Sequence, residues 1–101
     1  MSSAERAAPA DAQAELAAAR EEIEQLDREL VALVARRVAI ARRVGTLKHR
    51  LGMTTLDPER EASVVRRAAE LARDAALDVE ELRHLFWCVV GLSRRAQMEQ
   101  E

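Results

Sequence analysis

Two cationic side chains on one face of a predicted helix give the first indication of chemistry in this sequence. Arg37 and Lys48 are eleven residues apart, so at about 100° per residue they point within roughly 20° of each other. Lys48 is the only lysine among 16 lysine and arginine residues, which favours a need for a compact ammonium group. Taken alone, each also has an ordinary explanation. The stem of Arg37 can pack while its head reaches solvent, and Lys48 can be an exposed residue near a helix end.

Polar residues on two later segments point inward in the same way. Glu61 leans onto the apolar stripe of its own predicted helix, and Ser93 and Gln97 form an i, i+4 pair that continues the stripe of the last helix. A first-turn acid that complements the helix dipole and a frayed C-terminus are the ordinary alternatives. Together with the two cations, these residues predict one cavity that suits a small ligand with two carboxylates and a hydroxyl group.

Arg20 lies on a different face of the first helix. It precedes Arg37 by seventeen residues, which turns it by about 100° from that face. It cannot easily serve the same site from the same helix, but in an antiparallel dimer it could reach the partner's site. The alternative is a solvated surface arginine.

A long helix over residues 12 to about 51 must position Arg37 and Lys48. Its apolar residues recur in alternating steps of three and four, as in a coiled coil, with Arg37 in the same series. Such a helix spans about 60 Å at about 1.5 Å per residue, whereas a 100-residue domain has a radius of gyration near ~13 Å. The seam would remain wet unless a second chain covered it, so we expect an interwound homodimer. The seam consists of Leu16, Ala19, Ile23, Leu26, Leu30, Leu33, Ile40, Val44, Leu47 and Leu51.

Two shorter helices complete the predicted fold. Asp57 and Pro58 read as the N-cap and first residue of a helix that runs to about Ala75, and Asp78 begins a third helix that ends near Met98. We expect an all-α fold of one long and two shorter helices, with residues 1–11 as a disordered tail and residues 12–101 as the domain. The predicted stripes are Val64, Val65, Ala68, Leu71, Ala72 and Ala75, then Val79, Leu82, Leu85, Phe86, Val89 and Val90.

Composition argues against several classes of function. The net charge of −2 argues against binding to nucleic acid or to an anionic membrane surface. No apolar run reaches membrane-spanning length. The lone Cys88 suits a reducing compartment, and we see no secretion signal, so we expect a cytoplasmic protein. The sequence has no His/Cys metal cluster, Gly-rich phosphate loop or catalytic triad, and we predict no metal site.

From about Arg20 to Gln97, the chain resembles the all-helical (type II) chorismate mutases. The motifs that carry the resemblance occur in family order and at family spacing: REEIEQLD at 20–27, ARR at 35–37, VGTLK at 44–48, DPERE at 57–61, Leu85-Phe86, and Ser93 with Gln97. Departures lie in the linker, at His49, Arg50 and residues 52–55. The resemblance implies a pericyclic (Claisen) rearrangement of chorismate to prephenate in phenylalanine and tyrosine biosynthesis, with no cofactor.

The resemblance also implies a role for each site residue. Arg37 and the partner subunit's Arg20 would bind the two substrate carboxylates. Lys48 would contact a carboxylate and the breaking ether oxygen, and Gln97 would donate its amide to the same oxygen. Glu61 would hold the ring hydroxyl. These roles are completed by backbone near Asp57, which would assist Glu61, and by Arg60 and Ser93, which would support the carboxylate network.

Other readings remain open at this point. An isochorismate-pyruvate lyase shares the resemblance, but Glu61 disfavours it. An aminodeoxychorismate mutase is poorly separated by sequence. A non-catalytic coiled-coil dimerisation module would account for the seam but not for the inward polar residues. A mutase that is weak until bound to an upstream shikimate-pathway enzyme is the last alternative.

Overall fold

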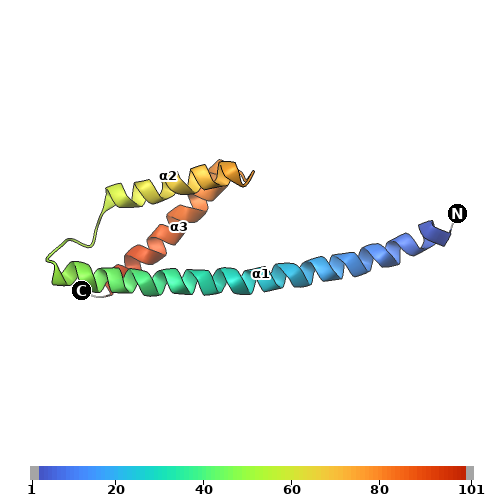
Figure 1. Ribbon diagram of the computed structural model, residues 1–101, viewed down its shortest axis with the longest axis horizontal. Coiled ribbons are helices and arrows are strands. Elements are labelled where there is room, and N and C mark those ends of the chain that lie inside the picture. Colours follow the sequence, from blue (N-terminus) through green and yellow to red (C-terminus); the bar gives the residue numbers. More distant parts are fainter. Residues whose placement is uncertain (1–2, 100–101) are drawn as a thin grey trace. The chain divides into compact units, whose positions relative to one another are not determined.

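Three helices make up the part of the chain that the computed structural model describes, residues 3–99, with side chains described from residue 9 onward. They are α1 (Ser3–Arg50), α2 (Pro58–Asp74) and α3 (Val79–Met98) (Figure 1). Within residues 3–99 there is no strand, so the predicted all-α class with one long and two shorter helices is confirmed. None of these helices is both long enough and apolar enough to cross a membrane.

The structure corrects the predicted start of the first helix. We expected residues 1–11 to form a tail, but α1 begins at Ser3 and includes Pro9. Alanine, which supplies four of the residues 1–11, has the highest helix propensity of any residue, and this favours a helix without apolar periodicity. Residues 1 and 2 lie outside the described residues, and the assignment of residues 12–101 to one domain stays a prediction.

The chain divides into two compact units, residues 1–33 and residues 34–101. In the first unit, every residue from 9 to 33 is exposed, including the seam residues Leu16, Ile23, Leu26, Leu30 and Leu33. The apolar seam of this unit is therefore uncovered in the single chain.

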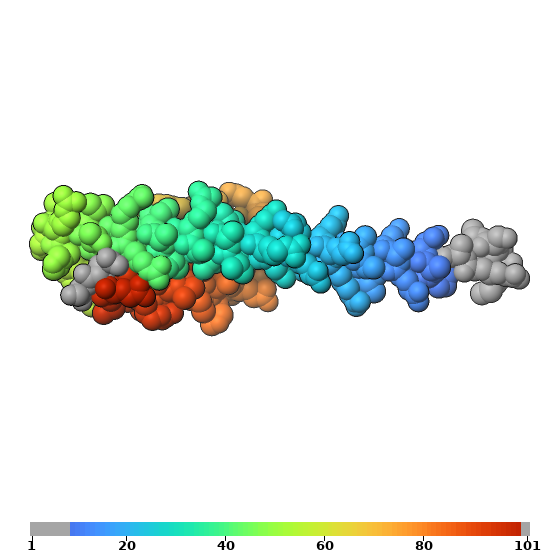
Figure 2. Space-filling model, turned by 90° about the horizontal axis from the view of Figure 1, so that it is seen from below, coloured from blue at the N-terminus to red at the C-terminus, as the bar shows by residue number. Residues whose placement is uncertain are grey.

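Small side chains form the interior of the second unit. α2 packs against α3, and the C-terminal part of α3 lies alongside the segment of α1 that belongs to this unit (Figure 2). Small residues allow helix axes to approach closely. The buried apolar residues are Ala41, Val65, Ala68, Ala69, Ala72, Val90 and Ala96.

The predicted stripes of α2 and α3 are only partly buried. Leu71 and Leu85 are 58% and 52% exposed, and Ala75 is exposed as well, so the single chain leaves these three stripe positions uncovered. Ala69, which was not predicted, is buried at 2% exposure. In α2 the alanine face packs inward, and the larger leucine is left at the edge of the interface.

The predicted helix starts are confirmed by their hydrogen bonds. Asp57 Oδ1 accepts from the backbone N–H of Arg60 at 3.0 Å, and Asp78 Oδ1 accepts from that of Glu81 at 2.9 Å. Each carboxylate satisfies an N–H group that has no partner within its helix. The first of these caps fixes the residue at which α2 begins.

The helix ends also share one hydrogen-bond pattern. After α1, the N–H of Met53 donates to the carbonyl of Lys48 at 2.9 Å, and the intervening Gly52 has φ +68°. After α2, the N–H of Leu77 donates to the carbonyl of Ala72 at 2.8 Å, with Ala76 at φ +57°. Both ends are Schellman motifs, but only the first places glycine in the left-handed position.

Candidate functional site

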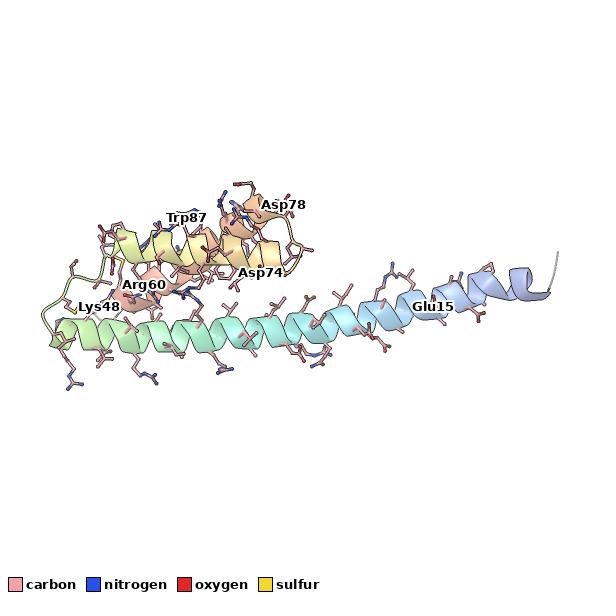
Figure 3. All side chains as sticks on the ribbon, turned by 45° about the horizontal axis from the view of Figure 1, so that its top comes forward. Glu15, Lys48, Arg60, Asp74, Asp78 and Trp87 are labelled. Carbon is pink, nitrogen blue, oxygen red and sulfur yellow. The ribbon has the colours of Figure 1, made fainter. Side chains whose placement is uncertain are left out.

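A pocket of about 450 Å³ lies within the second unit. Its volume falls in the range of roughly 300–1,000 Å³ that small-molecule sites occupy. The structure brings seven of the eight predicted site residues to its wall, from α1, α2 with its N-cap, and α3. These seven are Arg37, Lys48, Asp57, Arg60, Glu61, Ser93 and Gln97. Apolar residues complete the wall: Ile40, Ala41, Val44, Val64 and Val90. Figure 3 labels Lys48 near the end of α1 and Arg60 near the start of α2.

Arg37 is held against α3. Its Nη1 donates to Ser93 Oγ, and Ser93 is only 7% exposed. Burial lowers the pKa of Arg37, and the charge of Arg60 lowers it further. Arginine nevertheless keeps its charge throughout the physiological range, so the pocket contains a partly desolvated cation that is ready to bind an anion.

Lys48 links the end of α1 to α3 and to the segment between α1 and α2, residues 51–57. Its Nζ donates to the carbonyl oxygen of Thr55 at 3.1 Å and to Gln97 Oε1 at 3.0 Å. An ammonium group donates only, so it fixes the Gln97 amide with its oxygen toward Lys48 and its NH₂ group as the end that donates elsewhere. Lysine has three N–H groups, and these two acceptors use two of them.

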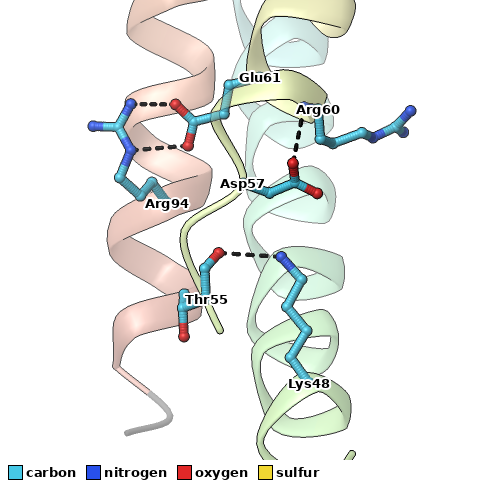
Figure 4. A network of polar contacts seen from close by, with 6 residues as sticks. All are labelled: Lys48, Thr55, Asp57, Arg60, Glu61 and Arg94. Carbon is cyan, nitrogen blue, oxygen red and sulfur yellow. Dashed lines mark hydrogen bonds and ion pairs between the residues drawn. The ribbon is translucent and has the colours of Figure 1, made fainter. Parts of the chain in front are cut away.

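Glu61 of α2 and Arg94 of α3 both belong to the pocket wall, where their side chains face each other (Figure 4). Arg94 Nε donates to Oε2 at 2.9 Å and Nη2 donates to Oε1 at 2.5 Å. The hydrogen bond from Arg94 lowers the pKa of Glu61 against the opposing effect of burial, and the same contact raises the pKa of Arg94. Glu61 is therefore held as a carboxylate, which can accept a hydrogen bond from a ligand.

Asp57 and Arg60 form the rim of the pocket at the start of α2. The Asp57 carboxylate is engaged in capping the helix, and the Arg60 side chain is exposed and extends away from Glu61 (Figure 4). Arg60 therefore adds positive charge to the pocket without neutralising the Glu61 carboxylate.

The charges on the wall favour an anionic ligand. Four cations, Arg37, Lys48, Arg60 and Arg94, stand against two carboxylates, Asp57 and Glu61, which leaves an excess of two positive charges. No group of three or more His, Cys, Asp or Glu side chains suited to a metal ion occurs among the described residues. The arrangement suits a small dianion that also carries a hydroxyl group.

Arg94 is the site residue that sequence reasoning missed, whereas Arg20 is the predicted one that remains unplaced. Arg94 precedes Gln97 by three residues, so i, i+3 spacing puts the two on one face of α3, and this signal was available in the sequence. Arg20 lies in the first unit, where it is exposed. Its assignment to a partner's site stays a prediction.

Comparison with known proteins gives one matching family. The model of the family "Chorismate mutase type II" matches residues 19–98, which is most of the chain and includes every predicted site residue.

Curated relatives and solved structures are also similar to this chain, and three of them are described below. The T-protein of Haemophilus influenzae is 39% identical over 70 residues, 66% of this chain and 19% of that protein. The chorismate mutase of Methanocaldococcus jannaschii is 33% identical over 63 residues, 62% of this chain and 64% of that protein. The match thus spans less than two thirds of either relative. A conserved hypothetical protein from Pyrococcus furiosus is 29% identical, with a TM-score of 0.67 over 82% of this chain and 95% of that one.

Proposed function

The chain belongs to the type II chorismate mutase family, and from this premise we propose that it rearranges chorismate to prephenate as a homodimer. In this reaction one C–O bond breaks while one C–C bond forms within the same molecule, so neither a nucleophile nor a proton transfer is required. The observation that carries the proposal is the pairing of Lys48 with Gln97 at 3.0 Å in the wall of a pocket with excess positive charge.

Lys48 and Gln97 are the proposed catalytic donors. The ether oxygen gains negative charge as its bond to the ring breaks, and donors aimed at that oxygen bind the transition state more tightly than the substrate. The third N–H of Lys48 and the NH₂ group of Gln97 supply two such donors from neighbouring points. Because each group is already held by a hydrogen bond, little reorganisation is needed during the reaction.

The remaining pocket residues would hold the substrate in its reactive shape. Arg37, with support from Ser93 and Arg60, would bind a carboxylate, and Glu61, with backbone near Asp57, would accept a hydrogen bond from the ring hydroxyl. Holding both ends folds the enolpyruvyl arm over the ring, which lowers the entropic cost of reaching the reactive conformer.

The proposed dimer would supply the second carboxylate ligand, the partner subunit's Arg20. Its support is the uncovered heptad seam, in which Leu26 and Leu30 are 56% and 58% exposed. A second copy of the chain offers the same seam, and pairing the two would bury both.

We expect the enzyme to act in the cytoplasm, where the free thiol of Cys88 would persist, and to serve phenylalanine and tyrosine biosynthesis.

The direct test is to mix purified protein with chorismate alone, to follow the loss of chorismate absorbance, and to identify the product. Prephenate formed without any additive supports the proposal. Turnover only with isochorismate, giving salicylate and pyruvate, or only with the amino analogue would assign the pocket to one of the related reactions. Turnover only after addition of an upstream pathway enzyme would show that the mutase depends on that partner. Failure to bind or convert any of these compounds would leave a dimerisation module.

A further inference from the structure

Arg94 has no role in the mechanism proposed above, yet it makes the most specific polar contact in the pocket. Its guanidinium meets Glu61 through two parallel N–H···O bonds, of 2.9 and 2.5 Å (Figure 4). Fork-to-fork contacts of this kind set the plane of a carboxylate as well as its charge. The Arg94 and Glu61 side chains are 35% and 20% exposed, so solvent does not fully screen the pair.

No other cation in the described pocket holds Glu61 in this way. From α1, the charge of Lys48 also lowers the pKa of Glu61, but the Lys48 ammonium donates its hydrogen bonds to Thr55 and Gln97. The Arg37 guanidinium donates to Ser93. At the start of α2, Asp57 adds a like charge beside Glu61, while the Arg60 side chain extends away from it (Figure 4). From α3, only Arg94 reaches the carboxylate.

We propose that Arg94 is a positioning residue that acts through Glu61, holding this carboxylate ionised and turned so that its remaining lone pairs meet the ligand's hydroxyl group. A carboxylate offers about four lone-pair sites, and Arg94 occupies two of them, one on each oxygen. The inference rests on the proposed function, because the donor that Glu61 accepts from is the hydroxyl of chorismate.

The pH dependence of kcat/KM distinguishes positioning from direct contact with the substrate. In wild-type protein, Arg94 lowers the pKa of Glu61, so Glu61 stays ionised and competent until the pH falls below the ordinary range of glutamate. In Arg94→Met, burial and the charge of Asp57 would raise the pKa of Glu61 with only the charge of Lys48 opposing them, so the acid limb should move to higher pH. Activity should then return toward the wild-type value at higher pH.

Two further variants serve as controls. Arg95→Met removes the neighbouring exposed arginine, which does not line the pocket. Its pH profile should keep the wild-type acid limb, and it also shows any part of that limb that comes from titration of the substrate. Arg94→Lys keeps the charge but not the fork, so its limb should lie between those of wild type and Arg94→Met. An acid limb in Arg94→Met that superimposes on that of Arg95→Met would overturn the inference. So would a loss of kcat/KM that is equal at every pH, since that indicates direct contact with the substrate.

A second measurement needs no turnover and separates this inference from the proposed function. A double-mutant cycle of Glu61→Gln with Arg94→Met in urea unfolding should give a coupling at neutral pH. The coupling should vanish as the pH falls through the folded-state pKa of Glu61, because that pKa is depressed and the stabilisation exists only while Glu61 is ionised. If wild-type protein converts no chorismate but the coupling is present, the proposed function fails and the Glu61–Arg94 pairing stands. If chorismate is converted but no coupling is found at any pH, the positioning role fails alone.

Discussion

The two compact units of the chain differ in whether they bury apolar side chains at all, since the second has a core of small residues although it also leaves large ones such as Leu71 and Leu85 exposed. In residues 9–33 the seam leucines are all exposed, for example Leu26 at 56% and Leu30 at 58%. In residues 34–99 the core consists of small residues, with Ala68 and Ala72 at 2% exposure. This difference indicates that small residues pack within the single chain, whereas the large exposed ones remain available to pack against a second chain.

The largest effect should come from charging the seam. Leu26→Glu would place a carboxylate at the centre of the proposed helix pair, where an unpaired charge is strongly unfavourable. Each leucine removed from an apolar interface costs about 1.5–3 kcal/mol, and a symmetric dimer loses two. We expect monomers and no detectable turnover, with the mass measured by light scattering and the activity by chorismate consumption.

The matched control is Gln25→Glu, which introduces the same residue one position away, off the seam. It should stay dimeric and active. A Leu26→Glu protein that is still a dimer would show that the exposed leucines of the first unit do not form the interface.

The next largest effect should come from the pocket side of the comparison. Lys48→Ala removes a donor aimed at the proposed ether-oxygen position, and loss of one such donor typically lowers kcat by about 10²–10³-fold. Circular dichroism and light scattering should show that the helical dimer survives, since Lys48 lies outside the seam. Arg50→Ala removes an exposed cation near the same helix end and should retain nearly full activity. A folded Lys48→Ala enzyme with wild-type kcat would remove Lys48 from the mechanism.

Much of this molecule was predictable from local patterns. The steps of three and four that predicted the long helix α1 and the caps at Asp57 and Asp78 are local, and the structure confirms the helix and both caps. Arg37 was found because it interrupts the seam and Lys48 because it shares a helix face with Arg37. Glu61, Ser93 and Gln97 were found because they lie on or continue apolar stripes, and all five residues line the pocket.

What remained unpredictable depends on contacts between helices. Whether Leu71 or Ala69 is buried in α2 is decided by how closely α3 approaches, and periodicity alone does not encode that distance. Arg94 shares a helix face with Gln97, but its importance became visible only when Glu61 of another helix was found opposite it. The left-handed conformation of Ala76 had no glycine to signal it.

An intermediate effect links the two units through the proposed dimer. Arg20→Ala and Arg37→Ala each remove one carboxylate ligand, so each homodimer should lose most of its activity. In a mixed dimer, one site combines both mutations and the other has neither, because Arg20 serves the partner's site. Mixing the two proteins under conditions that allow chain exchange should therefore restore part of the wild-type rate. Proven exchange without recovery would refute the cross-subunit role of Arg20 while leaving the pocket assignment of Arg37 intact.

The smallest effect should stabilise the packed unit without touching either the seam or the pocket. Ala76 adopts φ +57° in the same hydrogen-bond pattern that Gly52 forms at φ +68° after α1. A left-handed conformation costs a residue with a Cβ about 1–2 kcal/mol, whereas the added freedom of glycine in the unfolded chain costs about 0.4–1 kcal/mol. Ala76→Gly should therefore raise the free energy of unfolding by about 1 kcal/mol or less, as measured in urea.

Gly52→Ala makes the reverse change and should destabilise the protein, because its φ lies in the same region. Since Ala76 lies in neither the seam nor the pocket wall, the dimer dissociation constant and kcat should stay at their wild-type values. A change in the dissociation constant or in kcat would mean that the packing of α2 against α3 is coupled to the dimer interface or to the pocket, so that the three regions are not independent.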